Sequence, residues 1–126
     1  MIIDGKILGS IIDKEKEIGE YTLHDLNDVC YIDMFSVNKN QKNRVPRFNS
    51  RNLMTTEVRT FEAVKQGLED VGGNFLQMDT GLLVNFDLVK RILDTPQGLY
   101  ADFGDGYKVR IADNKDKMPI VKSLMY

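Results

Sequence analysis

The sequence predicts one mainly-β domain. Short runs rich in β-branched and aromatic residues recur along the chain and are separated by turn-forming residues. The clearest helical spacing is confined to one stretch near the middle of the chain. A length of 126 residues suits a single domain, and no internal repeat, low-complexity tract or linker divides it. We therefore expect residues 1–126 to form one domain of many short strands with two or three short helices.

The first strands are expected in the N-terminal third of the chain. Residues 7–12 and 17–23 flank the charged turn Asp13-Lys14-Glu15-Lys16, as in a hairpin. Residues 29–36 are rich in β-branched and aromatic types and are predicted to form a buried strand. Pro46 follows in a polar segment. Because proline cannot donate to a strand ladder, we do not expect a regular central strand around it.

The clearest helix follows a predicted strand at residues 53–58. Apolar residues recur there at helical spacing, with charged and polar residues between them: Phe61, Val64, Leu68 and Val71. Thr60 can cap the start of this helix, and Thr56 is an alternative start one turn earlier. Gly72 and Gly73 are expected to end it, because glycine reaches the left-handed conformation at little cost.

The C-terminal half continues with short strands. A short apolar piece at 75–78 precedes three predicted strands, at 88–93, 99–103 and 107–112. The turns Thr95-Pro96-Gln97-Gly98 and Gly104-Asp105-Gly106 separate them. Residues 113–126 are expected to form a short terminal helix, with Pro119 in its first turn or before it.

Composition places the chain among ordinary soluble proteins. It is 42% hydrophobic and 29% charged, and it contains no apolar stretch long enough for a signal peptide or a membrane span. With Cys30 as its one cysteine, it cannot form an intramolecular disulfide, which fits a reducing compartment. We therefore expect a cytoplasmic protein without contact to a membrane.

The charge is unevenly distributed. Residues 36–52, SVNKNQKNRVPRFNSRN, contain five cations and no acidic residue: Lys39, Lys42, Arg44, Arg47 and Arg51. This segment carries +5, which leaves −7 on the remainder of a chain whose net charge is −2. A localised basic stretch on an acidic protein suggests a loop that faces a polyanion. The alternative interpretation is a solvated surface loop.

Two tripeptides resemble catalytic motifs but lack their context. Asp79-Thr80-Gly81 is the active-site tripeptide of dimeric aspartic proteases, yet Leu82 follows where that family has Ala or Ser. That family's C-terminal apolar-apolar-Gly-Arg element is also absent. Asp102-Phe103-Gly104 spells a kinase tripeptide, but no phosphate-covering loop or catalytic loop accompanies it. We interpret it as a strand end running into a glycine turn, and we expect no enzyme activity.

The sequence offers no metal or cofactor site. One histidine, His24, and one cysteine cannot make a His/Cys zinc site. We expect His24 at the surface or at a sheet edge and Cys30 as a small core residue. No Walker loop, nucleophile elbow or dinucleotide-binding glycine motif occurs.

Three segments in order resemble the LytTR DNA-binding domain, the output module of LytR- and AgrA-type bacterial response regulators. They are LNDVCYID at 26–33, GLLVNFDLVKRI at 81–92 and LYADFGDGYKVRIA at 99–112. The helix at Phe61–Leu68 falls where the family has a short Ser/Thr-capped helix, so the resemblance covers about residues 17–126. It implies a mainly-β fold, a LytTR-like arrangement of short antiparallel sheets with two or three short helices.

The resemblance also implies which residues face DNA. Family members contact the major groove with loops, and three loops correspond here: the one after strand 29–36, the one before residue 82 and the one after the last strand. The DNA-binding residues expected from it are Asn38, Lys39, Asn40, Lys42, Asn43, Arg44, Arg47, Asp79, Thr80, Asp113, Asn114 and Lys115. Residues 82–84 would anchor the second loop, and Asn85 would fix its turn by hydrogen bonds to the backbone.

This chain departs from the family at two of these positions. The family's usual His is replaced by Asp79, and its usual Arg aligns near Asp113. Carboxylates at both places would repel the phosphates of DNA, although Asp can accept a hydrogen bond from cytosine. The longer basic segment 36–52 could compensate through phosphate contacts, with a change in specificity.

The resemblance thus implies a sequence-specific transcriptional regulator that binds double-stranded DNA. It is expected to act as a homodimer or as two copies on paired direct repeats, and as a stand-alone domain without a receiver domain. The alternative is a LytTR-like fold that has lost DNA binding and serves as a protein–protein interaction module. Asp79 and Asp113 favour the alternative, whereas the basic segment 36–52 favours DNA.

Overall fold

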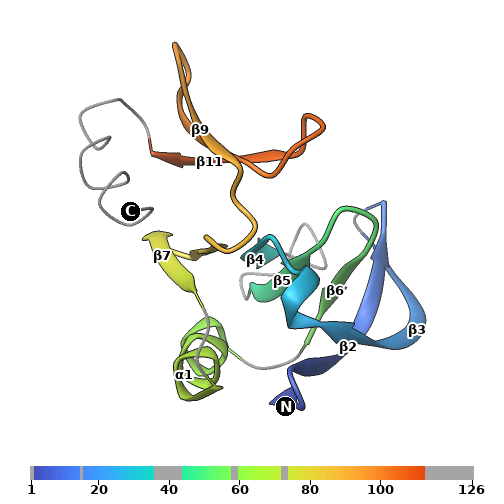
Figure 1. Ribbon diagram of the computed structural model, residues 1–126. Coiled ribbons are helices and arrows are strands. Elements are labelled where there is room, and N and C mark those ends of the chain that lie inside the picture. The colour runs from blue at the N-terminus through green and yellow to red at the C-terminus, as the bar shows by residue number, and fades with distance from the viewer. Residues whose placement is uncertain (1, 15, 36–43, 58–59, 72–73, 113–126) are drawn as a thin grey trace.

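The computed structural model describes residues 2–14, 16–35, 44–57, 60–71 and 74–112. Two antiparallel sheets and one α-helix make up this part of the chain (Figure 1). The larger sheet contains β1 (Ile2–Ile3), β2 (Lys6–Asp13), β3 (Lys16–Asp25), β4 (Tyr31–Phe35), β5 (Val45–Asn49), β6 (Met54–Thr56), β7 (Phe75–Asp79) and β8 (Leu82–Asn85). The smaller sheet contains β9 (Arg91–Thr95), β10 (Gly98–Asp102) and β11 (Lys108–Ala112). The mainly-β prediction is confirmed.

The strand order places the predicted segments side by side. The larger sheet runs β1-β2-β6-β5-β4-β8-β7, and β3 pairs with the other edge of β2. The predicted hairpin of β2 and β3 is confirmed, and its turn contains Lys14 with a φ of 50°. The ladder has an irregularity between Ser10 and Ile12, opposite the part of β3 that contains Gly19 with a φ of +79°. The N-terminal half of β3 is therefore irregular, and the half from Tyr21 onward is a regular strand.

The expectation that no regular central strand surrounds Pro46 is wrong. Pro46 is the second residue of β5, which lies between β4 and β6. The registered β5–β6 ladder ends at the Arg47–Thr56 pair, so Pro46 lies just beyond it. The Thr56 hydroxyl instead donates a hydrogen bond of 2.8 Å to the Pro46 carbonyl oxygen. A proline is tolerated here because it stands where the ladder stops.

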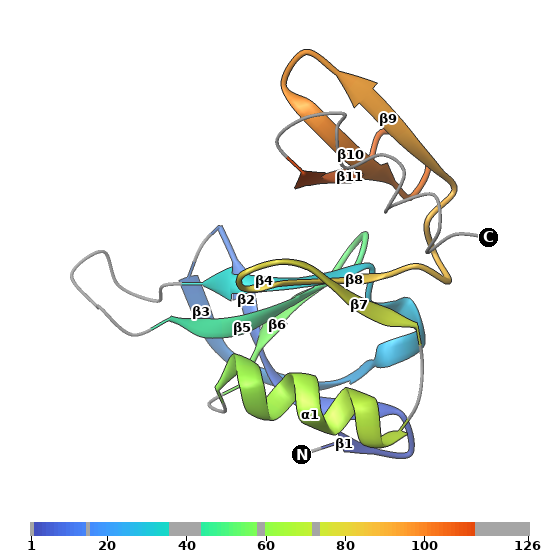
Figure 2. The ribbon, with the colours of Figure 1, turned by 90° about the vertical axis from the view of Figure 1, so that its left-hand side faces the viewer.

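The helix packs on one side of the larger sheet, and the smaller sheet packs on the other (Figure 2). The helix α1 (Phe61–Val71) begins as predicted after Thr60, whose hydroxyl oxygen accepts from the Ala63 N–H at 3.2 Å. Thr56, the alternative start, belongs to β6. The apolar face of α1, with Phe61, Val64 and Leu68, completes a core cluster with strand residues of the larger sheet: Ile7, Ile32, Phe48 and Leu83.

A second core cluster joins the two sheets. Its buried members come from β8, β10 and β11 and the segments next to them: Cys30, Leu82, Val84, Phe86, Leu99, Ala101, Phe103, Ile111 and Ala112. Three rings from both sheets lie together, with centroids 6.2 Å apart for Tyr31 and Phe103 and 5.7 Å apart for Phe103 and Tyr107. Cys30 is buried in this cluster, as predicted.

One strand begins later than predicted, and one short helical element was not predicted at its position. The strand expected at 88–93 begins only at Arg91, because residues 86–89 form a turn in which Leu88 N–H donates to the Asn85 carbonyl oxygen at 3.1 Å. A 3-10 turn at Leu26–Asp28 supplies the second helical element of the described residues. The predicted terminal helix at 113–126 lies outside them. No described helix is long and apolar enough to cross a membrane.

Candidate nucleic-acid interface

The turn between β7 and β8 contains the tripeptide Asp79-Thr80-Gly81. Gly81 has a φ of +80°, and a Cβ built on it would lie 2.8 Å from Cγ of Met34 on β4. The turn therefore needs glycine for its backbone conformation and for its close approach to β4. Asp79 and Thr80 are exposed, and an Asp79 carboxylate oxygen accepts from the Thr80 N–H at 2.7 Å. The two predicted contact residues thus project from a constrained turn.

The end of β4 and the start of β5 lie beside this turn. Met34 is registered opposite Pro46, and Phe35 is registered opposite Val45. Gly81, Met34 and Pro46 therefore lie in one row across the sheet, and exposed Arg44 lies one step beyond Val45. The other predicted contact residues of this loop lie outside the described residues: Asn38, Lys39, Asn40, Lys42 and Asn43. The described ends of the loop nevertheless lie next to Asp79 and Thr80.

The last strand leads toward the same region. β11 contacts β7, and Ile111 and Ala112 share a core cluster with Leu76 and Met78 of β7. Figures 1 and 2 both show the end of β11 beside the end of β7. Three predicted contact residues follow Ala112 and lie outside the described residues: Asp113, Asn114 and Lys115. The flanks of all three predicted DNA-facing loops are thus brought together.

Arg47, a predicted phosphate contact, is held by a carboxylate. It is registered opposite Asp33, and its Nε and Nη2 donate to the two carboxylate oxygens at 2.9 and 2.6 Å. Asn49 Nδ2 adds a hydrogen bond of 3.0 Å to the same carboxylate. A bidentate pair of this kind fixes both side chains. Arg47 therefore adds less positive potential to the interface than its charge alone suggests.

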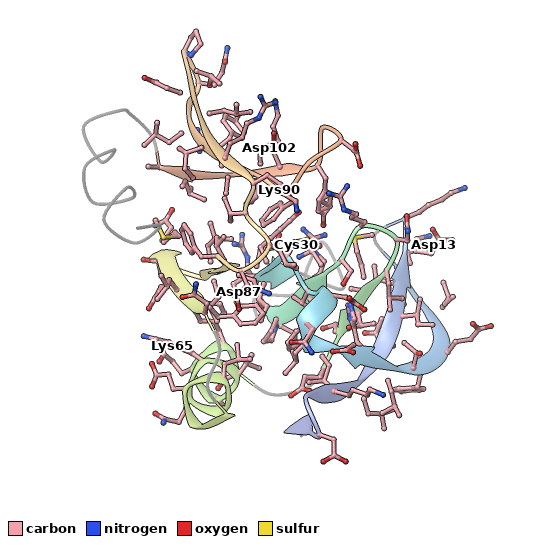
Figure 3. The ribbon with its side chains drawn as sticks, viewed as in Figure 1. Asp13, Cys30, Lys65, Asp87, Lys90 and Asp102 are labelled. Carbon is pink, nitrogen blue, oxygen red and sulfur yellow. The ribbon has the colours of Figure 1, made fainter. Side chains whose placement is uncertain are left out.

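Arg51, the last cation of the basic segment, joins the two sheets. Its guanidinium donates to the carbonyl oxygens of Phe103 and Gly104, the latter at 3.1 Å, and lies 3.3 Å from the Asp105 carboxylate. These acceptors belong to the turn between β10 and β11. A hollow of about 520 Å³ lies beside this contact and is also lined by His24, Cys30 and Lys90. Figure 3 shows Cys30 and Lys90 in the region between the sheets.

Asn85 fixes the segment that follows the interface turn, as predicted. Its Nδ2 donates to the Val29 carbonyl oxygen at 3.0 Å, and its Oδ1 accepts from the Asp87 N–H at 3.1 Å. Its own N–H donates to the Cys30 carbonyl oxygen at 2.9 Å. The side chain is buried, so these bonds satisfy polar groups that water cannot reach. Leu82, also predicted as part of the anchor, is buried beside the turn, as are residues 83 and 84.

His24 lies on the edge strand β3, which agrees with one of its two predicted placements, but its side chain is buried and not at the surface. It lies on β3 but is only 2% exposed, because its ring points inward toward β6 and the β5–β6 connection. Nδ1 lies 2.8 Å from the Thr55 hydroxyl oxygen, and Nε2 lies 2.5 Å from the Ser50 hydroxyl oxygen. Burial lowers the pKa of His24 below its ordinary 6.5, although the nearby carboxylates of Asp28 and Asp25 oppose this shift. His24 is therefore a structural residue.

The kinase-like tripeptide is a strand end, in agreement with the sequence interpretation. Asp102 ends β10, and its carboxylate accepts from Arg91 Nε at 2.7 Å and from the Gly104 N–H at 3.0 Å (Figure 3). The Arg91 hydrogen bond, together with the Gly104 N–H, holds the pKa of the Asp102 carboxyl below its usual range. Within the described residues, no group of three or more His, Cys, Asp or Glu side chains could hold a metal ion.

Comparison with known proteins identifies the fold. No protein-family model and no curated protein sequence matches the chain. Among solved structures, the chain is similar to the LytTr DNA-binding domain of a putative methyl-accepting/DNA response regulator from Bacillus cereus. The TM-score is 0.65 at 14% sequence identity, and the match covers 98% of each chain. The predicted LytTR-like fold is confirmed.

Proposed function

We propose that this chain is a DNA-binding domain of LytTR type that acts in transcription regulation. The observation that carries the proposal is the convergence of three loop flanks at one end of a LytTR fold. A rigid sheet that presents several loops on one side suits recognition of a surface such as a DNA groove. We infer that base contacts come from these loops, since no recognition helix projects from this end among the described residues.

The charge pattern supports phosphate contacts from the segment between β4 and β5. Residues 36–43 contain Lys39 and Lys42 and no acidic residue, and exposed Arg44 follows directly. Arg47 and Arg51 have carboxylate and carbonyl partners within the chain, so they contribute less to the field at the surface. We therefore assign most of the electrostatic affinity to Lys39, Lys42 and Arg44.

A second candidate function is a protein-interaction module with the same fold. The observation that favours it is the exposed Asp79 carboxylate in the turn that would face the phosphates. Asp33 adds to this by neutralising Arg47 in the neighbouring strand pair. A partner with basic or hydrogen-bonding groups would suit this turn better than a polyanion does.

Selection from a random-sequence duplex pool tests the proposal. The protein is expected to retain duplexes at low salt and to enrich a defined sequence at moderate salt. The logarithm of the binding constant should fall with log salt by about 0.9 for each phosphate contact. A protein that retains no duplex even at about 50 mM salt would leave the interaction-module function in its place.

A charge-matched comparison tests where the affinity resides. Changing Lys39, Lys42 and Arg44 together to Ala should reduce the salt slope by about 2 to 3. The control changes three exposed lysines away from the interface to Ala: Lys6, Lys90 and Lys108. Equal losses in the two triple variants would show that net charge, and not the proposed loop, determines binding.

A further inference from the structure

The β2–β3 hairpin carries an exposed apolar patch. Four large hydrophobic side chains are exposed in the described part of the chain, and all lie on this hairpin: Leu8 at 59%, Ile18 at 47%, Tyr21 at 68% and Leu23 at 64%. Leu8 is registered opposite Leu23, and Ser10 is registered opposite Tyr21. We call Leu8, Tyr21 and Leu23 the hairpin patch. Clustering of this kind marks an interaction surface, whereas isolated exposed hydrophobic residues need no explanation.

The orientation of β3 is the reverse of the usual one. In a strand with one solvated face, apolar side chains normally point to the core and polar ones to water. Here His24 points inward and is 2% exposed, while the neighbouring Leu23 points outward at 64%. The hydrogen bonds of His24 to Thr55 and Ser50 fix this orientation. The hydrogen-bonded His24 side chain therefore keeps the apolar face of the strand turned outward.

β3 is also an open edge. Among the described residues it pairs with β2 alone, so its other side offers unpaired backbone N–H and C=O groups. Proteins usually protect such edges with lysine, proline or a bulge. Residues 17–24 contain no lysine, arginine or proline, and the irregularity near Gly19 affects only the first half of the strand. The regular stretch from residue 21 to residue 25 therefore has no lysine, proline or bulge that would block pairing, and no described strand covers it.

We propose that β3 pairs antiparallel with β3 of a second copy of this chain, about a two-fold axis at Thr22. This register places Tyr21 opposite Leu23 of the second copy, and Leu23 opposite Tyr21 of the second copy. Because Leu8 is already opposite Leu23, two rows then cross the joined sheet, each containing Leu8, Leu23 and Tyr21 of the second copy. The two hairpin patches become one, and the two sheets become continuous.

Charge and side-chain packing favour this register over two alternatives. About Thr22, Glu20 lies opposite His24 and Asp25 lies opposite Gly19, so no like charges meet. A two-fold axis at Glu20 would place the two Glu20 carboxylates opposite each other, which is destabilising. An axis at Tyr21 would place Leu23 opposite Gly19, which has no side chain to cover it. The contact is small, so we expect a dimer that dissociates on dilution.

Disulfide trapping tests the register directly. In a Cys30→Ala background, Thr22→Cys places two thiols across the axis, and opposed antiparallel residues have Cα atoms about 4.5–5.5 Å apart, within disulfide range. The matched control is Glu20→Cys on the same strand, whose two copies would be offset by four residues. The Thr22→Cys protein should form at least tenfold more covalent dimer than the control in a glutathione buffer. Equal yields in the two variants, or none in either, would overturn the register.

Sedimentation velocity over a range of concentrations tests the dimer itself. The parent should shift toward a dimer as concentration rises, and Tyr21→Glu with Leu23→Glu should remain monomeric. The control adds two carboxylates elsewhere, with Ala63→Glu and Gln66→Glu on the exposed face of α1, and should still dimerise. A parent protein that stays monomeric at every concentration would overturn the proposal, and would leave another protein as the partner for the hairpin patch. Both tests are made without DNA, so they stand or fall independently of the proposed function.

Discussion

His24 shows how a single polar residue can set the orientation of a strand. The alternation of Tyr21 and Leu23 with polar neighbours predicts that the apolar residues face the core. Sequence reasoning missed the inward histidine because its partners, Thr55 and Ser50, lie about thirty positions away. Asn85, by contrast, was predictable because it resembles a family position and bonds the backbone of its own turn.

The buried His24 should make stability depend on pH. Its pKa is lowered in the folded protein by burial, whereas the unfolded chain titrates near 6.5. The unfolded state therefore binds the proton first, and the free energy of unfolding should fall as pH drops below about 6.5. Urea titrations from pH 8 to pH 5 measure this. Since His24 is the one histidine, His24→Gln should remove the dependence in this window. A slope that persists in His24→Gln would assign the effect to other groups.

Gly81 and Gly106 form a matched pair of turn glycines. Both have a φ of +80°, but a Cβ at Gly81 would lie 2.8 Å from Met34 Cγ, whereas nothing lies within 4 Å at Gly106. Each change to Ala should cost about 1–2 kcal/mol of backbone strain. Gly81→Ala should cost more, by an amount limited by how far the Met34 side chain can move. Thermal unfolding measures both. Equal losses would show that the β7–β8 turn does not depend on its contact with β4.

At the scale of elements, most of the strands could be predicted, whereas β1, β5 and β8 were not. The hairpin of β2 and β3, the helix α1 and the hairpin of β10 and β11 follow from local alternation, capping and turn residues. β5 could not be predicted, because its proline and its basic composition are locally typical of a loop. The strand forms because Phe48 is completely buried under α1 and because β4 and β6 pair with it on both sides.

The connection between the sheets depends on Arg51. Arg51→Ala removes hydrogen bonds to the carbonyl oxygens of Phe103 and Gly104 and leaves those acceptors without a charged donor. We expect a loss of about 1–2 kcal/mol in unfolding free energy, since the side chain is partly exposed. Asp105→Asn, which suits the residue's φ of 54°, should cost less than about 0.5 kcal/mol, because that carboxylate is almost fully exposed. Chemical denaturation of both variants would measure the difference, and an equal effect would place the interaction in the ion pair instead.

At the scale of the whole molecule, the fold was predictable from motif order, whereas the arrangement of the candidate interface residues was predictable only in part. Three weak segments in a plausible order indicated a LytTR-like arrangement, and the structural similarity at 14% identity confirms it. The convergence of the described flanks of the three loops depends on the strand order β4-β8-β7 and on the contact of β11 with β7. The sequence indicated five cations available to DNA, but in the structure Arg47 and Arg51 bind groups of the chain itself. These partners could not be predicted, because they come from other segments of the chain.

Asp79 is the position where one nearly isosteric substitution tests how the electrostatic potential of the candidate interface affects DNA binding. Asp79→Asn keeps an oxygen that can accept from the Thr80 N–H, which the carboxylate accepts at 2.7 Å, but removes the charge. If the three loops meet DNA together, this change should tighten general duplex binding by about 0.5–1 kcal/mol, because charge at an exposed position is partly screened. Asp79→His, the residue type that is usual in the LytTR family at the position Asp79 resembles, should tighten it further.

Asp94→Asn is the control for this change, since that carboxylate is also exposed but lies on β9, in the other sheet. Fluorescence anisotropy with random-sequence duplexes at two salt concentrations compares the variants. The gain at Asp79 should shrink as salt rises, and Asp94→Asn should have little effect at either concentration. If Asp79→Asn instead weakens binding to one selected sequence, the carboxylate reads a base, and cytosine N4 is the donor it would fit. If the two Asn variants behave alike, the β7–β8 turn does not face the duplex.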